Sequence, residues 1–259
     1  MYSVTGRVKE VKQPRGGYIK PSEFDVINLN DGNVLNDNEN VHASIIGMVV
    51  DYLTRLVMSG DLVDSFRISI TGSAYAAKRN GERVLKEAYG YLRNINGLDD
   101  NSIINACKMV TFDVWYRNPM AALLAKQAKD INPDSATIEN IRTMVKRSVS
   151  FFETYGPITV DGFTFEPNGY TETVSAGDGD FLTSDTLWDF KVSKSKPTNK
   201  HTLQLLMYGI MGQHSGKEEF KNIIKLGIFN PRLNNVYLLE MSKVSGETIA
   251  EIEKDVICY

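Results

Sequence analysis

Two short segments decide the fold of this chain: Gly177-Asp178-Gly179-Asp180 and, a few residues later, Trp188-Asp189-Phe190-Lys191. Strands are predicted at Asp180-Phe181-Leu182 and Thr186-Leu187-Trp188-Asp189-Phe190, and Thr183-Ser184-Asp185 between them favours a turn. We therefore predict a hairpin in which Asp180 lies beside Asp189. Because alternate residues of a strand share a face, Asp189 and Lys191 should point to one side and Phe190 to the other, into the core.

This arrangement predicts a metal site with hydrolytic chemistry. Adjacent carboxylates such as Asp180 and Asp189 repel each other unless a cation binds, and oxygen ligands suit Mg²⁺ or Mn²⁺. The main-chain carbonyl of Phe190 is a candidate further ligand. Lys191 would orient the nucleophile or stabilise charge that develops on an attacked phosphate. One preorganised donor supplies roughly 3–4 kcal/mol, whereas phosphoester hydrolysis can need on the order of 20 kcal/mol, so a metal would carry most of the catalysis.

The hydrophobic period changes along the chain, and this change predicts its organisation. Residues 1–38 are expected to form extended pieces and turns, and a helix with apolar residues at positions 45, 46, 49, 50, 53, 56 and 57 follows. Helical periodicity then continues over 61–77, 81–94, 99–116 and 135–155. Strands are predicted at 158–160, 163–165, 170–174, 180–182, 186–190, 223–229 and 235–241, with helices at 199–213 and 245–256.

These elements predict an α/β fold: a mixed central sheet of about four to six strands, flanked by helices and interrupted by an all-helical insertion. The core is expected in residues 39–60 and 156–259, the insertion in 61–155, and an N-terminal extended segment in 1–38.

Composition narrows the functional classes. The formal charge of −3 over 259 residues gives no overall basic field, which argues against a protein that coats DNA but is compatible with an acidic catalytic site. Cys107 and Cys258 have no CxxC spacing, which argues against a cysteine-based zinc site, an iron–sulfur cluster or a disulfide framework. No signal-like segment and no apolar run long enough for a bilayer are evident, so we expect a cytoplasmic protein without membrane contact.

Taken in order, the motifs resemble those of the PD-(D/E)XK nuclease superfamily, especially its RecB-like branch. Gly177-x-x-Asp180, Asp189-x-Lys191 and Gln204-x-x-x-Tyr208 follow one another as they do there, with Gly179 where the superfamily name has proline. The resemblance implies a restriction-endonuclease-like core and Mg²⁺- or Mn²⁺-dependent, exonuclease-like cleavage of DNA. It also implies that Gln204 and Tyr208, which are four residues apart on one helical face, line the site and contact the substrate.

The resemblance extends to an upstream helix. The branch has a Gly-x-x-x-His helix whose histidine completes the metal site, and Gly47 to Asp51 has this spacing with aspartate in the place of histidine. Asp51 is thereby proposed as a third metal ligand, and aspartate is a harder ligand that suits Mg²⁺. Glu39 and His42, roughly two to three helical turns upstream, are rival ligands, and His42 is also expected at the start of the helix.

Several alternatives stay open at this point. Lys194, Lys196 and Lys200, with His201, surround the proposed site at the strand end and the start of the helix of Gln204, where the lysines would meet a phosphate backbone or form a solvated loop. The substrate could be RNA, since nothing in the sequence reads a 2′-hydroxyl. The chain could also be a catalytically silent binding or assembly module that meets a protein partner through its helical insertion. The sequence gives no oligomeric state.

Overall fold

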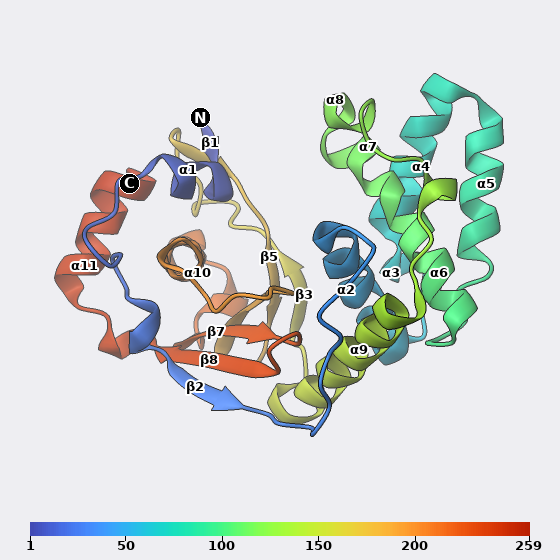
Figure 1. The fold of residues 1–259 in the computed structure, drawn as a ribbon. Coiled ribbons are helices and arrows are strands. Elements are labelled where there is room, and N and C mark those ends of the chain that lie inside the picture. The colour runs from blue at the N-terminus through green and yellow to red at the C-terminus, as the bar shows by residue number, and fades with distance from the viewer. The chain divides into compact units, whose positions relative to one another are not determined.

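A computed structural model describes residues 1–259, and the chain forms two compact units (Figure 1). Residues 1–30 and 151–259 form the sheet unit, and residues 31–150 form the helical unit. These boundaries differ from the predicted ones. Residues 1–30 belong with the sheet because one of their strands joins it, and the helix predicted in 39–60 belongs with the other helices, against which it packs.

The sheet unit contains a mixed six-stranded sheet, which confirms the predicted α/β class. Its strands are β2 (Asp25–Asn28), β3 (Val160–Phe163), β5 (Gly179–Leu182), β6 (Thr186–Phe190), β7 (Lys225–Asn230) and β8 (Asn235–Glu240), in the order β2-β8-β7-β6-β5-β3. Only β6 and β7 are parallel; the other neighbours are antiparallel. The parallel pair needs a crossover, and α10 (Asn199–Ser215) supplies it.

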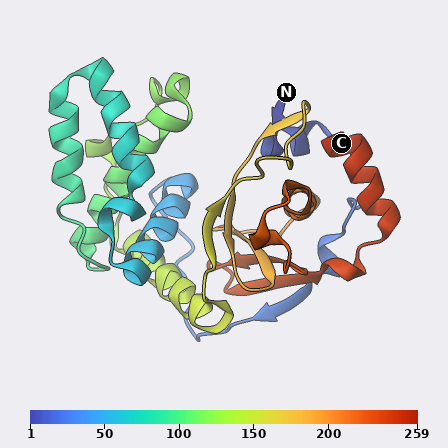
Figure 2. The ribbon, with the colours of Figure 1, turned by 180° about the vertical axis from the view of Figure 1, so that it is seen from behind.

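Helix α10 is buried on nearly all sides, which explains why its sequence is apolar around its circumference. In Figures 1 and 2 it runs inside the curve of the sheet, with α1 (Val4–Glu10) and α11 (Gly246–Glu251) on its other side. Leu182 and Leu187 face α10 from the sheet. Their neighbours Phe181 and Trp188 face the opposite way, where they pack with Phe151 at the end of α9 (Ser135–Tyr155). The core of this unit therefore lies on both faces of the sheet.

The N-terminal prediction was partly wrong, because residues 4–10 form a helix. Ser3 caps this helix by accepting a hydrogen bond from the Gly6 N–H, and the buried Val4 and Val8 lie one turn apart on the face toward α10. Gly6 inside the helix weakens the helical signal of so short a segment. Residues 170–173, predicted as a strand, form no strand; only β4 (Val174–Ala176) does, pairing with β1 (Tyr2–Ser3).

The helical unit confirms the predicted all-helical segment. Its helices are α2 (Ala43–Ser59), α3 (Leu62–Ser65), α4 (Arg67–Asn80), α5 (Glu82–Leu92), α6 (Asp100–Met109), α7 (Asp113–Arg117), α8 (Pro119–Ala122) and most of α9. Asp99 caps α6 by accepting a hydrogen bond from the Ser102 N–H. Gly60, with φ of 71°, ends α2 in the left-handed region that glycine adopts without strain. No helix in the chain has both the length and the apolarity that crossing a bilayer requires.

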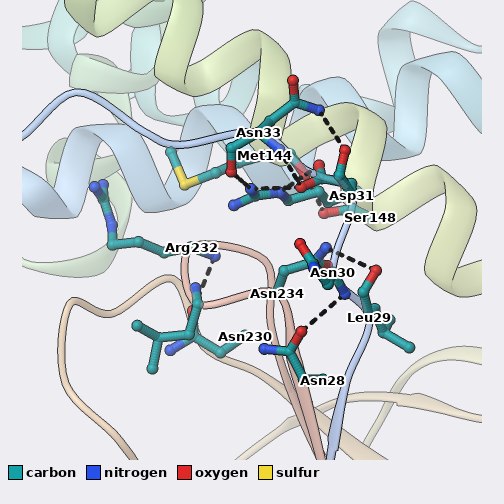
Figure 3. Close-up of polar contacts among 12 residues, drawn as sticks. Asn28, Leu29, Asn30, Asp31, Asn33, Met144, Ser148, Asn230, Arg232 and Asn234 are labelled. Carbon is teal, nitrogen blue, oxygen red and sulfur yellow. Dashed lines mark hydrogen bonds and ion pairs between the residues drawn. The ribbon is translucent and has the colours of Figure 1, made fainter.

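Polar contacts fix the chain where each unit begins or ends. In the sheet unit, Leu29 exchanges hydrogen bonds with Asn234: its N–H donates to the Asn234 carbonyl (2.9 Å), and the Asn234 side chain donates to its carbonyl (3.3 Å) (Figure 3). In the helical unit, Asp31 accepts two bonds of 2.8 Å from Arg147, which also donates to the Asn33 carbonyl. These bonds to Arg147 hold the pKa of Asp31 well below its ordinary value.

Candidate active site

The predicted hairpin is present, and it brings Asp180 and Asp189 together. Strands β5 and β6 pair antiparallel with Phe181 opposite Trp188, so the next step of the register brings Asp180 opposite Asp189. Oδ2 of Asp180 accepts a hydrogen bond of 2.6 Å from the main-chain N–H of Phe190. The ring of Phe190 turns away toward the aromatic cluster on the other face, as predicted from the alternation.

Lys191 pairs with Asp189 on the α10 face of the sheet. Its Nζ lies 2.9 Å from Oδ1 of Asp189, and its side chain is 28% exposed while that of Asp189 is only 5% exposed. Burial by itself would lower the pKa of Lys191, but the Asp189 and Asp180 carboxylates outweigh burial and raise it. Lys191 is therefore a cation at neutral pH, able to donate but not to act as a base.

The second oxygen of Asp189 is the anomaly of the site. Oδ2 is buried and has no hydrogen-bond partner in the protein, although the other oxygen is paired with Lys191. An unsatisfied buried polar atom costs about 1–3 kcal/mol, and more when it is charged. Such an atom calls for a bound cation or an ordered water.

A chain of polar contacts continues from Lys191 onto α10. Nζ of Lys191 lies 3.5 Å from Oε1 of Gln204, and Nε2 of Gln204 donates to the hydroxyl of Tyr208 at 2.8 Å. Because Lys191 can only donate, its contact orients the amide of Gln204 and leaves the NH₂ for Tyr208. Burial and the carboxylates of Asp189 and Asp180 raise the pKa of Tyr208 against the opposing bond from Gln204, so the phenol stays protonated.

The structure gives a physical reason for glycine at position 179. A Cβ atom built on Gly179 would lie 2.0 Å from the ring of Phe163, which sits on the neighbouring strand β3. Proline or any other residue would collide with this ring. Phe163 packs in turn against Tyr208, with ring centroids 6.2 Å apart. The missing side chain thus makes room for the aromatic support of Tyr208.

The remaining predicted ligands belong to the helical unit. Asp51 lies on α2, where Oδ1 accepts a bond of 2.9 Å from Arg55, and its role as a third metal ligand stays a prediction. Glu39 accepts a bond from Asn140 at 2.9 Å. His42 is the N-cap of α2 and accepts from the Ser44 N–H, which confirms its place at the helix start.

The predicted lysines surround the beginning of α10. Lys194 and Lys196 are exposed in the loop between β6 and α10, and Lys200 is exposed in the first turn of the helix. This position fits contact with phosphates near the helix N-terminus, and that contact stays a prediction. No group of three or more histidine, cysteine, aspartate or glutamate side chains is placed to hold a metal ion. A Mg²⁺ site with one or two carboxylates and several waters does not need such a group.

The helical unit has a separate cavity of about 600 Å³ with no counterpart in the sequence predictions. Its wall is mainly apolar, from α2, from the Val110–Val114 segment and from residues 125–132, and its volume is that of a small-molecule pocket. Asp113 at this wall is buried and accepts short bonds from Tyr52 and Ser69.

Comparison of the chain with models of protein families, with curated proteins and with solved structures found no match. The resemblance to the nuclease superfamily thus stays a prediction from the motifs.

Proposed function

We propose that this chain is a Mg²⁺- or Mn²⁺-dependent phosphodiesterase that cleaves DNA, and that its sheet unit is a restriction-endonuclease-like core. The observation that carries the proposal is the partnerless Oδ2 of Asp189, buried in a site that also contains Asp180 and Lys191. A structural ion pair needs only one lysine and one aspartate. A second aspartate and an unused, buried oxygen are better explained by a site that accepts a cation.

The residues of the site fit a divalent metal of this class. Oδ2 of Asp189, the carboxylate of Asp180 and the carbonyl of Phe190 are the oxygen atoms that would hold it. When bound, such an ion supplies Lewis-acid polarisation of a phosphoryl oxygen and a water of lowered pKa. The cation would also satisfy the buried carboxylate oxygen that has no partner within the chain.

The other side chains have distinct roles in this proposal. Lys191 donates from its ammonium to the attacking water or to a non-bridging oxygen of the phosphate, where negative charge develops. Gln204 holds Lys191 in place through its amide oxygen and is itself oriented by Tyr208. Lys194, Lys196 and Lys200 would bind neighbouring phosphates of the DNA strand.

A second candidate function is that of a binding or assembly module without turnover. The cavity of the helical unit favours it, together with the exposed Met120 and Leu124 in and after α8. In that case the helical unit would take a ligand or protein partner. We include a cytoplasmic location in the proposal, because both cysteines are free thiols, as is typical of reducing compartments.

The test is cleavage of labelled linear and circular, single- and double-stranded DNA, and of RNA, with Mn²⁺ or with a chelator. We expect metal-dependent cleavage of DNA that is lost in Asp189→Ala and Lys191→Ala. The matched control is Lys225→Ala, which breaks the Asp185–Lys225 ion pair of similar length (2.8 Å) at the other end of β6 and β7. Cleavage without metal, or in Asp189→Ala, would refute the mechanism. Cleavage of RNA alone would identify a ribonuclease, and Mn²⁺ binding without any cleavage would favour the binding module.

A further inference from the structure

His201 lies on the same stripe of α10 as the two site residues of this helix. Positions 201, 204 and 208 are separated by three and four residues, so their side chains follow one another along one face. Gln204 on this stripe contacts Lys191. The ring of His201 is half-buried, and its electrostatic neighbours are Lys191 and Asp189.

The hydrogen bonds of His201 fix its tautomer. Nδ1 accepts the main-chain N–H of Thr198 at 3.2 Å as part of the capping box that begins α10. Because Nδ1 is an acceptor, the proton of a neutral imidazole is on Nε2. Nε2 has no partner in the chain. Burial, and then the charge of Lys191, lower the pKa of His201 against the opposing effect of Asp189, which favours this neutral form.

We propose that His201 is a substrate-binding residue of the site, whose Nε2–H donates a hydrogen bond to a non-bridging oxygen of the phosphodiester. The proposal rests on the proposed nuclease function. The capping bond at Nδ1 anchors the ring, and Lys191 binds the same phosphate from the sheet. The substrate oxygen would replace the partner that Nε2 lacks in the protein.

Two substitutions separate this role from helix capping. In His201→Asn the shorter amide can occupy the position of Nδ1 and keep the cap, but it cannot reach the position of Nε2. In His201→Gln the longer amide can supply a donor near Nε2, and glutamine is also accepted at this position of a capping box. The matched control is His214→Asn at the other end of α10, where Nε2 contacts Glu253 at 2.8 Å.

The measurements are single-turnover cleavage rates of a labelled DNA with Mn²⁺ and melting temperatures of the same proteins. We expect His201→Asn to keep the wild-type melting temperature within about 2 °C and to cleave about 10- to 100-fold more slowly, as for the loss of one hydrogen bond to a charged group. His201→Gln should recover most of the rate, and His214→Asn should cleave like wild type. A phosphorothioate in place of the contacted oxygen should slow wild type more than His201→Asn.

The outcomes separate the role of His201 from the proposed nuclease function. If wild type cleaves no nucleic acid, the proposed function is wrong. If wild type cleaves and His201→Asn cleaves equally fast, or responds equally to the phosphorothioate at both stereochemical positions, the role of His201 is wrong while the nuclease proposal stands. A parallel loss of rate and melting temperature in both His201 variants would show that the residue serves only as a cap.

Discussion

Lys191 and Asp189 form an ion pair that uses only half of the carboxylate. Nζ of Lys191 lies 2.9 Å from Oδ1 of Asp189, while Oδ2 is buried without a partner. A pair selected for stability alone would gain from a second donor, because an unpaired buried oxygen destabilises the folded state. The unpaired oxygen therefore departs from what stability alone would favour, as the proposed function requires.

The first prediction concerns the response of Asp189→Asn to metal. Replacing the carboxylate by an amide removes the anionic oxygen that would bind the metal, and it also breaks the ion pair with Lys191, so the variant in chelator should melt at or below the wild-type temperature. Wild type should gain stability with Mn²⁺, by about 2.7 kcal/mol at a hundredfold excess over Kd. The variant should lose this gain. Thermal unfolding with and without Mn²⁺ measures both effects.

Asp185→Asn is the control for this comparison, because Asp185 lies in the same hairpin but pairs with Lys225. It should respond to Mn²⁺ like wild type. An undiminished Mn²⁺ shift in Asp189→Asn would mean that the metal binds elsewhere.

The second prediction concerns pH. The carboxylates of Asp189 and Asp180 raise the pKa of Lys191 above its ordinary 10.5, despite the opposing effect of burial. A group with a raised pKa contributes stability that is complete below the unfolded pKa and is lost as pH rises through the folded value. The ammonium should thus stay charged, and the cleavage rate should show no loss from Lys191 between about pH 7 and pH 9.5.

Titration of the Lys191 Nζ by ¹⁵N NMR tests the same point without turnover. The expected midpoint lies above 10.5 in metal-free protein. A midpoint clearly below this value would show that burial outweighs the two carboxylates, and Lys191 could then serve as a general base.

The third prediction addresses Gln204 as the link between Lys191 and Tyr208. Gln204→Met keeps the length of the side chain but removes both polar contacts, so we expect about a tenfold lower rate and a loss of stability of about 1–2 kcal/mol. Tyr208→Phe leaves Nε2 of Gln204 without its acceptor and should cost about 1–3 kcal/mol. Because both changes break the same bond, the double variant should lose less than their sum.

Gln213→Met on the same helix is the matched control, since its amide makes only a long contact of 3.8 Å with the Met241 sulfur. It should leave the rate unchanged. Strictly additive losses for Gln204→Met and Tyr208→Phe would show that the two residues do not act as a unit.

The hairpin and its helix could be predicted because their signals are local. Strand alternation places Asp189 and Lys191 on the same face of their strand. Four-residue spacing places Gln204 and Tyr208 on the same face of their helix. Helical period likewise predicted α9 over residues 135–155. These features need only the regular geometry of one element or of two elements joined by a short turn.

The features that escaped prediction depend on distant packing. Strand β2 joins the sheet beside β8, which follows it by about two hundred residues, so no local pattern reveals the pairing. Asp189 Oδ2 lacks a hydrogen-bond partner only because no donor from any surrounding element lies within reach of it. The sequence alone does not show where those donors lie. His201 was noted beside the lysines near the site, but a single histidine at a helix start is ambiguous until its capping bond is known.

The last prediction concerns Gly179 and Phe163. Alanine at position 179 would place Cβ against the Phe163 ring, so Gly179→Ala should lose about 1–3 kcal/mol as an overpacked core residue. Displacement of the ring would also disturb Tyr208, which packs against it, and the cleavage rate should fall with stability. Combining Gly179→Ala with Phe163→Leu relieves the collision, so the double variant should be more stable than the sum of the single effects predicts, by at least about 0.5 kcal/mol.

Denaturant unfolding measures the coupling, and Gly90→Ala, which meets no atom within 4 Å, is the control. Additivity between positions 163 and 179 would show that the sheet yields at Gly179 instead, and the glycine would then have no packing reason to be there.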